Sequence, residues 1–145
     1  MTLTRRLTMF AAALVLVLGL AACGGYGKSK KSEEGTTTTI GGVQAESHGT
    51  TDVSDATGKV EIEMYDNYFE PTVLKGKPGQ KVTLELKNEG KVAHTFTLAE
   101  QSVDQEVQPG DEAEADVTFP KSGELGFTCK FHGSSGMVGA LEASS

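Results

Sequence analysis

Hydrophobic and polar residues alternate along most of the chain after residue 57. In the clearest run, Val82, Leu84 and Leu86 are separated by charged or hydroxyl side chains. Alternation with period two is typical of a β-strand that has one buried and one solvated face. The same pattern occurs at residues 60–64, 94–98, 113–119 and 125–129. No long run in this part of the sequence has the period of an amphipathic helix, so the pattern predicts a domain made of strands.

Short segments that contain Pro and Gly separate these runs, at residues 77–79, 108–110 and 120–123. Both residue types favour turns between strands. Short strands at this spacing predict an all-β fold, an antiparallel two-sheet Greek-key sandwich of roughly seven to eight strands. We expect this domain to span residues 58–145, a length that allows only a modest core.

The composition is different in residues 24–57, which are rich in Gly, Ser and Thr and contain few large apolar side chains. Such a segment cannot bury enough apolar surface to form a core of its own. We therefore expect residues 23–57 to form a flexible tether with a root-mean-square span of about 30 to 35 Å. His48 lies within this segment and is expected to be solvated.

Residues 1–22 have the pattern of a secretory signal peptide. Arg5 and Arg6 form its basic start, and the apolar stretch that follows is shorter than the roughly 20 residues of a membrane-spanning helix. The small residues directly before Cys23 resemble the lipobox of bacterial lipoproteins, which implies cleavage before Cys23 and acylation of its thiol and amine. We therefore expect a protein that is lipid-anchored to the cell membrane, on its extracytoplasmic (periplasmic or outer) side.

The chain contains two cysteines, Cys23 and Cys129. A disulfide between them would be the ordinary expectation for an exported protein. Acylation of Cys23 forbids this bond and leaves Cys129 as a free thiol. Because an exported free thiol is prone to oxidation unless it is buried or bound to a metal, Cys129 is a candidate metal ligand.

Three further candidate ligands accompany this thiol. His132 and Met137 follow Cys129 within nine residues, and His94 lies 35 residues before it. One thiolate, two imidazoles and one thioether are the donors of a blue-copper electron-transfer centre, in which the thioether is a weak axial ligand. The alternation places Cys129 and His94 on the inward faces of two strands, and we expect these donors to meet only if two sheets pack together.

Each of these residues alone has a simpler explanation. Cys129 can be a small buried hydrophobe, His94 a core or turn histidine, Met137 packing material and His132 an exposed loop residue. Only the joint pattern favours a metal. Zinc is an alternative, but structural zinc sites usually close with Cys or His and not with a thioether. A Cys–His nucleophilic pair needs an oxyanion site and a substrate cleft, which nothing else in the sequence indicates, so we do not expect an enzyme.

The segment GFTCKFHGSSGMVG, residues 126–139, resembles the copper loop of cupredoxins of the plastocyanin and pseudoazurin type. Upstream segments at residues 69–71, 78–82, 88–90 and 94–96 are similar to the first-ligand half of small bacterial cupredoxins. The resemblance implies one type 1 copper ion, with the ligands His94, Cys129, His132 and Met137. It also implies that the His132 imidazole lies near the surface in a small apolar patch, with contributions from Phe131, Gly133, Gly136 and Met137.

Two positions depart from the plastocyanin pattern. Phe131 stands where many such loops have Pro before the second His, which bears on the rigidity of the loop and on the redox potential. Thr95 stands where plastocyanins usually have an Asn whose side chain helps to tie the two ligand segments together. We expect Thr95 to provide this connection only in part.

The chain has a net charge of −7, which becomes −9 when Arg5 and Arg6 are removed with the signal peptide. Binding to nucleic acid is not expected for such an acidic protein. Residues 100–116 contain seven acidic residues and no Lys or Arg. We interpret this stretch as a solvated strand face that protects a sheet edge. The alternative is that it steers a basic redox partner such as a cytochrome.

Together these features favour a monomeric, membrane-tethered type 1 copper protein that carries single electrons between redox proteins of the bacterial cell envelope. A cytochrome, an oxidase or a reductase are the kinds of partner we expect. One alternative is a copper-binding lipoprotein for copper buffering or delivery, whose copper should exchange with chelators. Another is a domain that docks on an oxidase or reductase, whose partner binding should survive loss of the metal.

Overall fold

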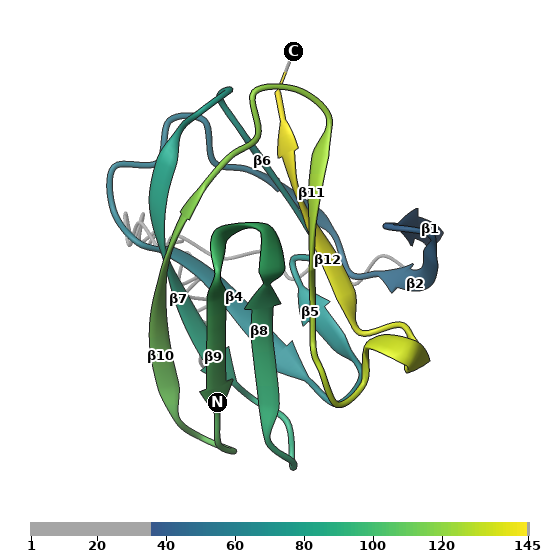
Figure 1. The fold of residues 1–145 in the computed structure, drawn as a ribbon. Coiled ribbons are helices and arrows are strands. Elements are labelled where there is room, and N and C mark those ends of the chain that lie inside the picture. Colours follow the sequence, from purple (N-terminus) through teal and green to yellow (C-terminus); the bar gives the residue numbers. More distant parts are fainter. Residues whose placement is uncertain (1–35, 145) are drawn as a thin grey trace, which may run out of the picture. The chain divides into compact units, whose positions relative to one another are not determined.

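The computed structural model describes residues 36–144, and these residues form an all-β fold (Figure 1). The proposed signal peptide and Cys23 lie outside the described residues. Within residues 36–144, no helix is long and apolar enough to span a membrane. The helical elements of this part of the chain are two short 3-10 helices, η1 (Ala99–Gln101) and η2 (Gly133–Ser135).

Two sheets face each other in the described part of the chain. The smaller sheet has the strand order β10 (Glu112–Thr118), β7 (Lys81–Asn88), β4 (Val60–Tyr65), β5 (Tyr68–Glu70). The larger sheet has the order β3 (Thr50–Asp52), β6 (Val73–Gly76), β12 (Val138–Ala143), β11 (Glu124–Thr128), β8 (His94–Leu98), β9 (Val103–Val107). The predicted sandwich is confirmed. It has ten strands in the described residues and not seven to eight, and the short strands β3 and β5 could not be recognised because they are too short to show an alternating pattern.

The core lies between the two sheets and consists of the inward residues of the alternating runs. In β4 and β7 every second residue is buried, as the pattern predicts. Across the core, the Phe127 ring lies 4.6 Å from the Phe96 ring and 5.1 Å from the Phe69 ring, measured between centroids. Each such buried side chain contributes about 1.5–3 kcal/mol to folding. Cys129 and Met137 belong to the same cluster, so the core continues into the candidate site.

Three strand pairs run parallel: β4 with β7, and β6 with both β3 and β12. Both sheets of the sandwich are therefore mixed, and not purely antiparallel as expected. Alternation reports which face of a strand is buried, but it does not report the direction of the neighbouring strand. That direction follows from connections that cross between the sheets. Between the parallel strands β4 and β7, for example, the chain leaves the smaller sheet after β5, passes through β6 of the larger sheet and returns as β7. The strands β9 and β10 lie side by side although they belong to different sheets (Figure 1).

The segment expected to be a tether forms strands in its second half. β1 (Thr36–Ile40) and β2 (Val43–Ser47) form a hairpin, and Ile40 and Ala45 are each only 3% exposed. They pack against Val138 and Ala140 of β12. A few apolar residues suffice here because β12 already offers an apolar face, and the Thr-rich β1 favours a strand. This corrects the expectation of a flexible tether for the part of the segment that the structure describes.

His48 also differs from expectation. It follows β2, and its ring stacks on the Tyr68 ring with 3.6 Å between centroids. Its backbone N–H donates to the Thr72 hydroxyl at 2.7 Å. The solvated histidine expected from composition is therefore packed against β5, because the hairpin brings it to the sandwich.

Candidate metal centre

His94, Cys129 and His132 come together where β8 begins and β11 ends. His94 is the first residue of β8, Cys129 directly follows β11, and His132 directly precedes η2. The two strands are neighbours in the larger sheet, with Thr128 opposite Thr97, so the donors meet within one sheet and not between two packed sheets as expected. One ligand atom from each of the three side chains lies within 4.8 Å of the other two. The structure thus brings together three of the residues that the sequence singled out.

The Cys129 sulfur lies between the two imidazoles. Its Sγ is 3.8 Å from Nδ1 of His94 and 3.6 Å from Nδ1 of His132. The two imidazole centroids are 5.0 Å apart, with the rings tilted by 59°. Donors bound to one ion through bonds of about 2.0–2.3 Å lie roughly 3.5–4 Å apart in a trigonal arrangement. The observed spacing and the donor types therefore fit a site for a single copper ion.

Burial differs among the three side chains. His94 and Cys129 are fully buried, whereas His132 is partly exposed. Burial is the main cause that lowers the pKa of His94, because it disfavours the charged ring. The hydrogen bond that His94 donates to Asp66 opposes this shift, and the neighbouring His132 adds to it. Since neutral imidazole is the form that binds metal, the environment favours the ligating form of His94.

The loop after β11 is closed by its own backbone. The Cys129 carbonyl accepts hydrogen bonds from the N–H groups of His132 at 3.2 Å and Gly133 at 2.7 Å. The Cys129 N–H donates to the Met137 carbonyl at 3.1 Å, and the Met137 N–H donates to the His132 carbonyl at 3.1 Å. These bonds fix the three loop residues of the candidate ligand set relative to one another.

Met137 is fully buried and belongs to the same core cluster as Cys129. It therefore faces the protein interior and does not contribute to the surface patch in which the resemblance placed it. The preceding Gly136 has φ of 98°, which favours glycine. A Cβ at Gly136 would lie 3.0 Å from the Gln44 carbonyl, so β2 packs directly against the ligand loop.

Thr95 connects the two ligand segments. Its backbone N–H donates to the Cys129 sulfur at 3.4 Å, and its hydroxyl accepts a hydrogen bond from the Lys130 N–H at 2.8 Å. An Asn side chain offers more donors and acceptors than a hydroxyl. The single side-chain bond to the loop agrees with the expectation that Thr95 provides this connection only in part.

One residue at this site was not found from the sequence. Asp66 lies in the turn between β4 and β5, and its Oδ1 is 3.4 Å from Nε2 of His94. The Lys91 N–H donates to the same oxygen at 2.9 Å, and this bond is the main cause that lowers the pKa of Asp66. No sequence pattern marks Asp66, because the turn meets His94 only when the two sheets pack together.

Comparison with known proteins decides what kind of domain carries this cluster. Residues 16–141, most of the chain, match the family described as the cupredoxin-like domain. The chain belongs to the cupredoxin-like family. The resemblance seen in the copper-loop segment is confirmed at the level of the family.

A relative of this cupredoxin is named as a copper protein. The copper-resistant cuproprotein CopI of Pseudomonas aeruginosa is 36% identical over 55 residues, which are 38% of this chain and 30% of CopI. The match thus spans less than a third of the length of that relative.

Solved structures show the same fold. The metal-binding domain of the Streptococcus pneumoniae D39 Cu(I)-exporting P-type ATPase CopA, with Cu(I), has a TM-score of 0.54 at 13% identity, covering 68% of this chain and 98% of that domain. Dithionite-reduced auracyanin from Roseiflexus castenholzii has a TM-score of 0.51 at 18% identity, covering 62% of this chain and 99% of auracyanin.

Large apolar side chains are exposed in both ligand segments of the cupredoxin. Val92, two residues before His94, is 46% exposed, and Phe131, directly before His132, is 52% exposed. The Phe131 and His132 rings lie 6.4 Å apart. Phe131, one of the patch residues expected from the resemblance, is thus exposed beside the partly exposed His132. Val92 is a second exposed apolar residue, and the sequence did not indicate it.

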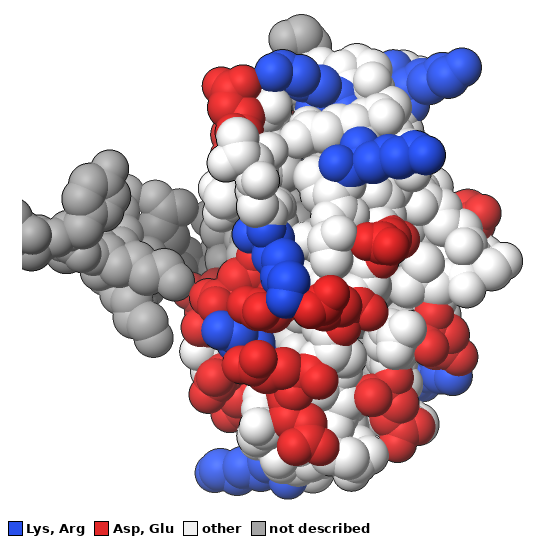
Figure 2. All heavy atoms as spheres, turned by 90° about the vertical axis from the view of Figure 1, so that its left-hand side faces the viewer, with Lys and Arg blue, Asp and Glu red and all other residues white. Residues whose placement is uncertain are grey.

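The acidic stretch occupies η1, β9 and β10. Three of its carboxylates pair with lysines of other segments: Glu114 with Lys59, Glu112 with Lys87 and Asp104 with Lys130. Figure 2 shows acidic side chains gathered on one face, with lysines among them. Solvent screens exposed ion pairs of this kind, so they add little to stability. The arrangement supports the interpretation as a solvated strand face.

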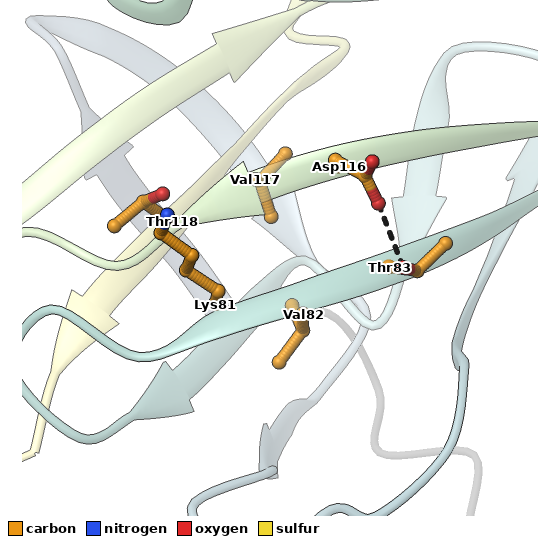
Figure 3. A pocket seen from close by; sticks show the side chains of 6 residues that line it. All are labelled: Lys81, Val82, Thr83, Asp116, Val117 and Thr118. Atoms are coloured by element: carbon orange, nitrogen blue, oxygen red, sulfur yellow. Dashed lines mark hydrogen bonds between the residues drawn. The ribbon is translucent and has the colours of Figure 1, made fainter.

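A shallow hollow lies over β7 and β10 (Figure 3), lined by Lys81, Val82, Thr83, Asp116, Val117 and Thr118. Within it, the Thr83 hydroxyl donates to Asp116 Oδ1 at 2.7 Å. The hollow lies at the start of β7, whereas Asn88 at the end of β7 bonds to the segment before His94. None of its lining residues belongs to the His–Cys–His cluster, so this hollow does not serve as a substrate cleft for that cluster.

Proposed function

We propose that this cupredoxin binds one type 1 copper ion and carries single electrons between redox proteins of the bacterial cell envelope. The observation that best supports the proposal is the donor spacing of 3.6 and 3.8 Å between the Cys129 sulfur and the two Nδ1 atoms. His94, Cys129 and His132 would hold the ion, with Met137 as a weak axial ligand. Copper in such a donor set gains and loses one electron with little change of geometry.

The protein would hold the donors in fixed positions and exclude water from them. His94 and Cys129 have no exposed surface, so water is kept from this side of the site. Backbone hydrogen bonds close the loop, and Thr95 fixes that loop to β8. Donors held in this way need to move little when the charge of the site changes, which favours fast electron transfer.

His132 is the proposed point of entry and exit for electrons because it is the partly exposed member of the cluster. Phe131 and Val92 provide apolar surface in the adjoining segments. A small apolar contact suits the brief, low-area encounters that are typical of redox partners.

Location and partners complete the proposal. The signal-like residues 1–22 and the small residues before Cys23 support a lipid anchor on the extracytoplasmic side of the cell membrane. The partners would be envelope proteins such as a cytochrome, an oxidase or a reductase. The cupredoxin itself would act as a monomeric carrier and not as an enzyme.

A second candidate function is copper buffering or delivery. It is favoured by the names of two similar proteins, one copper-resistant and the other a domain of a Cu(I)-exporting ATPase. The same three donors would then hold copper in transit. The two functions differ in how firmly copper is held and in how fast the site exchanges electrons.

Two measurements on the copper-loaded protein separate these functions. The first is the rate of electron exchange between oxidised and reduced protein, followed by NMR line broadening. The second is loss of Cu(I) to a high-affinity chelator such as bathocuproine disulfonate. An electron carrier should exchange electrons quickly and retain copper through repeated redox cycles. Rapid loss of copper to the chelator together with slow electron exchange would favour buffering or delivery.

A further inference from the structure

Asp66 meets the buried candidate ligand His94 from the opposite sheet. Its Oδ1 lies 3.4 Å from Nε2 of His94, the ring nitrogen that does not face Cys129. The Asp66 side chain is 42% exposed, whereas the His94 side chain is fully buried. The carboxylate is therefore the boundary between the buried imidazole and solvent.

The surrounding backbone is arranged around this contact. The Lys91 N–H donates to Asp66 Oδ1 at 2.9 Å and so fixes the carboxylate. At Gly90 a Cβ would lie 2.6 Å from Asp66 Oδ1 and 2.9 Å from His94 Nε2, which is too close for any side chain. Glycine at position 90 thus leaves the room in which the two groups meet.

Asn88 holds the same segment from its other side. Its side-chain amide donates to the carbonyls of Val92 and Val107, both at 2.8 Å, and its Oδ1 accepts from the Gly90 N–H at 2.9 Å. Asn88 is only 2% exposed. Asn88 therefore anchors the segment that leads to His94, and the Lys91 N–H holds Asp66, so both partners of the contact are fixed.

We propose that Asp66 is a positioning residue for the copper site. Its carboxylate accepts a hydrogen bond from Nε2–H of His94, so that Nδ1 of this ring faces the metal. Its negative charge also lowers the reduction potential of the copper ion. This proposal rests on the proposed function. A carboxylate behind a ligating histidine fixes the ring tautomer and makes the imidazole a stronger donor. A nearby negative charge also favours the oxidised ion over the reduced ion, because the oxidised ion carries one more positive charge.

A purely structural role for Asp66 makes a different prediction. Asp66 would then serve only to hold the β4–β5 turn through Lys91. A substitution that removes the charge of Asp66 but keeps its oxygen acceptor would in that case leave the reduction potential of the copper site unchanged. The substitution Asp66→Asn separates the two roles, since the amide oxygen can still accept both hydrogen bonds.

The test compares Asp66→Asn, Asp66→Ala and the control Asp55→Asn in the full-length, copper-loaded chain. Asp55 is an exposed acid that pairs with Lys77, so its substitution removes the same charge at a different surface site. We expect Asp66→Asn to retain the visible absorption of the copper site but to have a higher reduction potential than the wild type. Asp55→Asn should match the wild type. Asp66→Ala should in addition lose copper to a chelator about 10- to 100-fold more readily.

A second readout needs no copper. In the metal-free protein, nitrogen-15 NMR of the His94 ring should show a proton on Nε2 in the wild type and loss of this preference in Asp66→Ala. An unchanged reduction potential in Asp66→Asn, or an unchanged tautomer in Asp66→Ala, would overturn the proposal. Failure of the proposed function would instead appear in the wild type itself, as absence of the copper absorption, while the tautomer measurement would still decide the role of Asp66.

Discussion

Thr95 and Cys129 lie 34 residues apart in the sequence, yet the Thr95 N–H donates to the Cys129 sulfur at 3.4 Å. The same residue accepts a hydrogen bond from the Lys130 N–H through its hydroxyl at 2.8 Å. Both bonds join β8 to the loop after β11. The site therefore depends on a connection between two strands as well as on its four candidate ligands.

Thr95→Val tests this connection. Valine keeps the shape of the side chain but leaves the Lys130 N–H without its acceptor, so we expect the free energy of unfolding of the metal-free protein to fall by about 1–3 kcal/mol. Urea unfolding measures this change. Thr83→Val is the matched control, because the Thr83 hydroxyl bonds to an exposed Asp116. A loss in Thr95→Val no larger than that in the control would show that the connection is unimportant.

His94→Ala should abolish the intense thiolate-to-copper absorption, because it removes a buried imidazole 3.8 Å from the Cys129 sulfur. The visible spectrum after addition of Cu(II) measures the effect. His48→Ala is the control, since His48 stacks on Tyr68 and is not part of the His–Cys–His cluster. If His94→Ala retained an unchanged copper spectrum, the ligand assignment would be wrong.

Met137→Leu should retain copper and raise its reduction potential, because loss of a thioether donor weakens the binding of the oxidised ion more than that of the reduced ion. The swap nearly conserves volume and should change the free energy of unfolding by less than about 1.5 kcal/mol. Redox titration of the copper-loaded protein gives the potential. Met64→Leu, at another fully buried methionine, controls for packing. A potential and spectrum equal to those of the wild type would remove Met137 from the ligand set.

The hairpin of β1 and β2 should contribute to stability. Ile40→Ala removes a side chain that is 3% exposed and packs in the cluster with Val138 of β12. We expect the free energy of unfolding to fall by about 2 kcal/mol, as for other large-to-small changes at buried positions. Val43→Ala, at a partly buried position of β2, should have a smaller effect. A free tether would instead give no change in either variant.

The sequence predicted the sandwich, and it also singled out the main candidate ligands, because both inferences depend on local patterns. Val82, Leu84 and Leu86 alternate visibly, and they are buried as expected. Cys129, His132 and Met137 lie on one loop, so their spacing alone indicated a shared role. His94 was linked to them by its donor type and by its place on an inward strand face.

The features that the sequence did not reveal all depend on contacts between distant segments. Asp66 reaches His94 only because the β4–β5 turn meets the start of β8. The isolated Ile40 and Ala45 do not look like core residues until β12 lies beside them. Parallel pairing of β4 with β7 is likewise a matter of chain direction, which alternation does not encode.

The most direct test of the proposed copper site is the visible and electron paramagnetic resonance spectrum of the purified protein after addition of one equivalent of Cu(II), followed by reduction with ascorbate. A type 1 copper site with Cys129 as a ligand should give an intense thiolate-to-copper band and narrow hyperfine splitting, both lost on reduction and restored on oxidation. A weak or absent band would show that Cys129 does not bind Cu(II), and would contradict the proposed electron-carrying copper site.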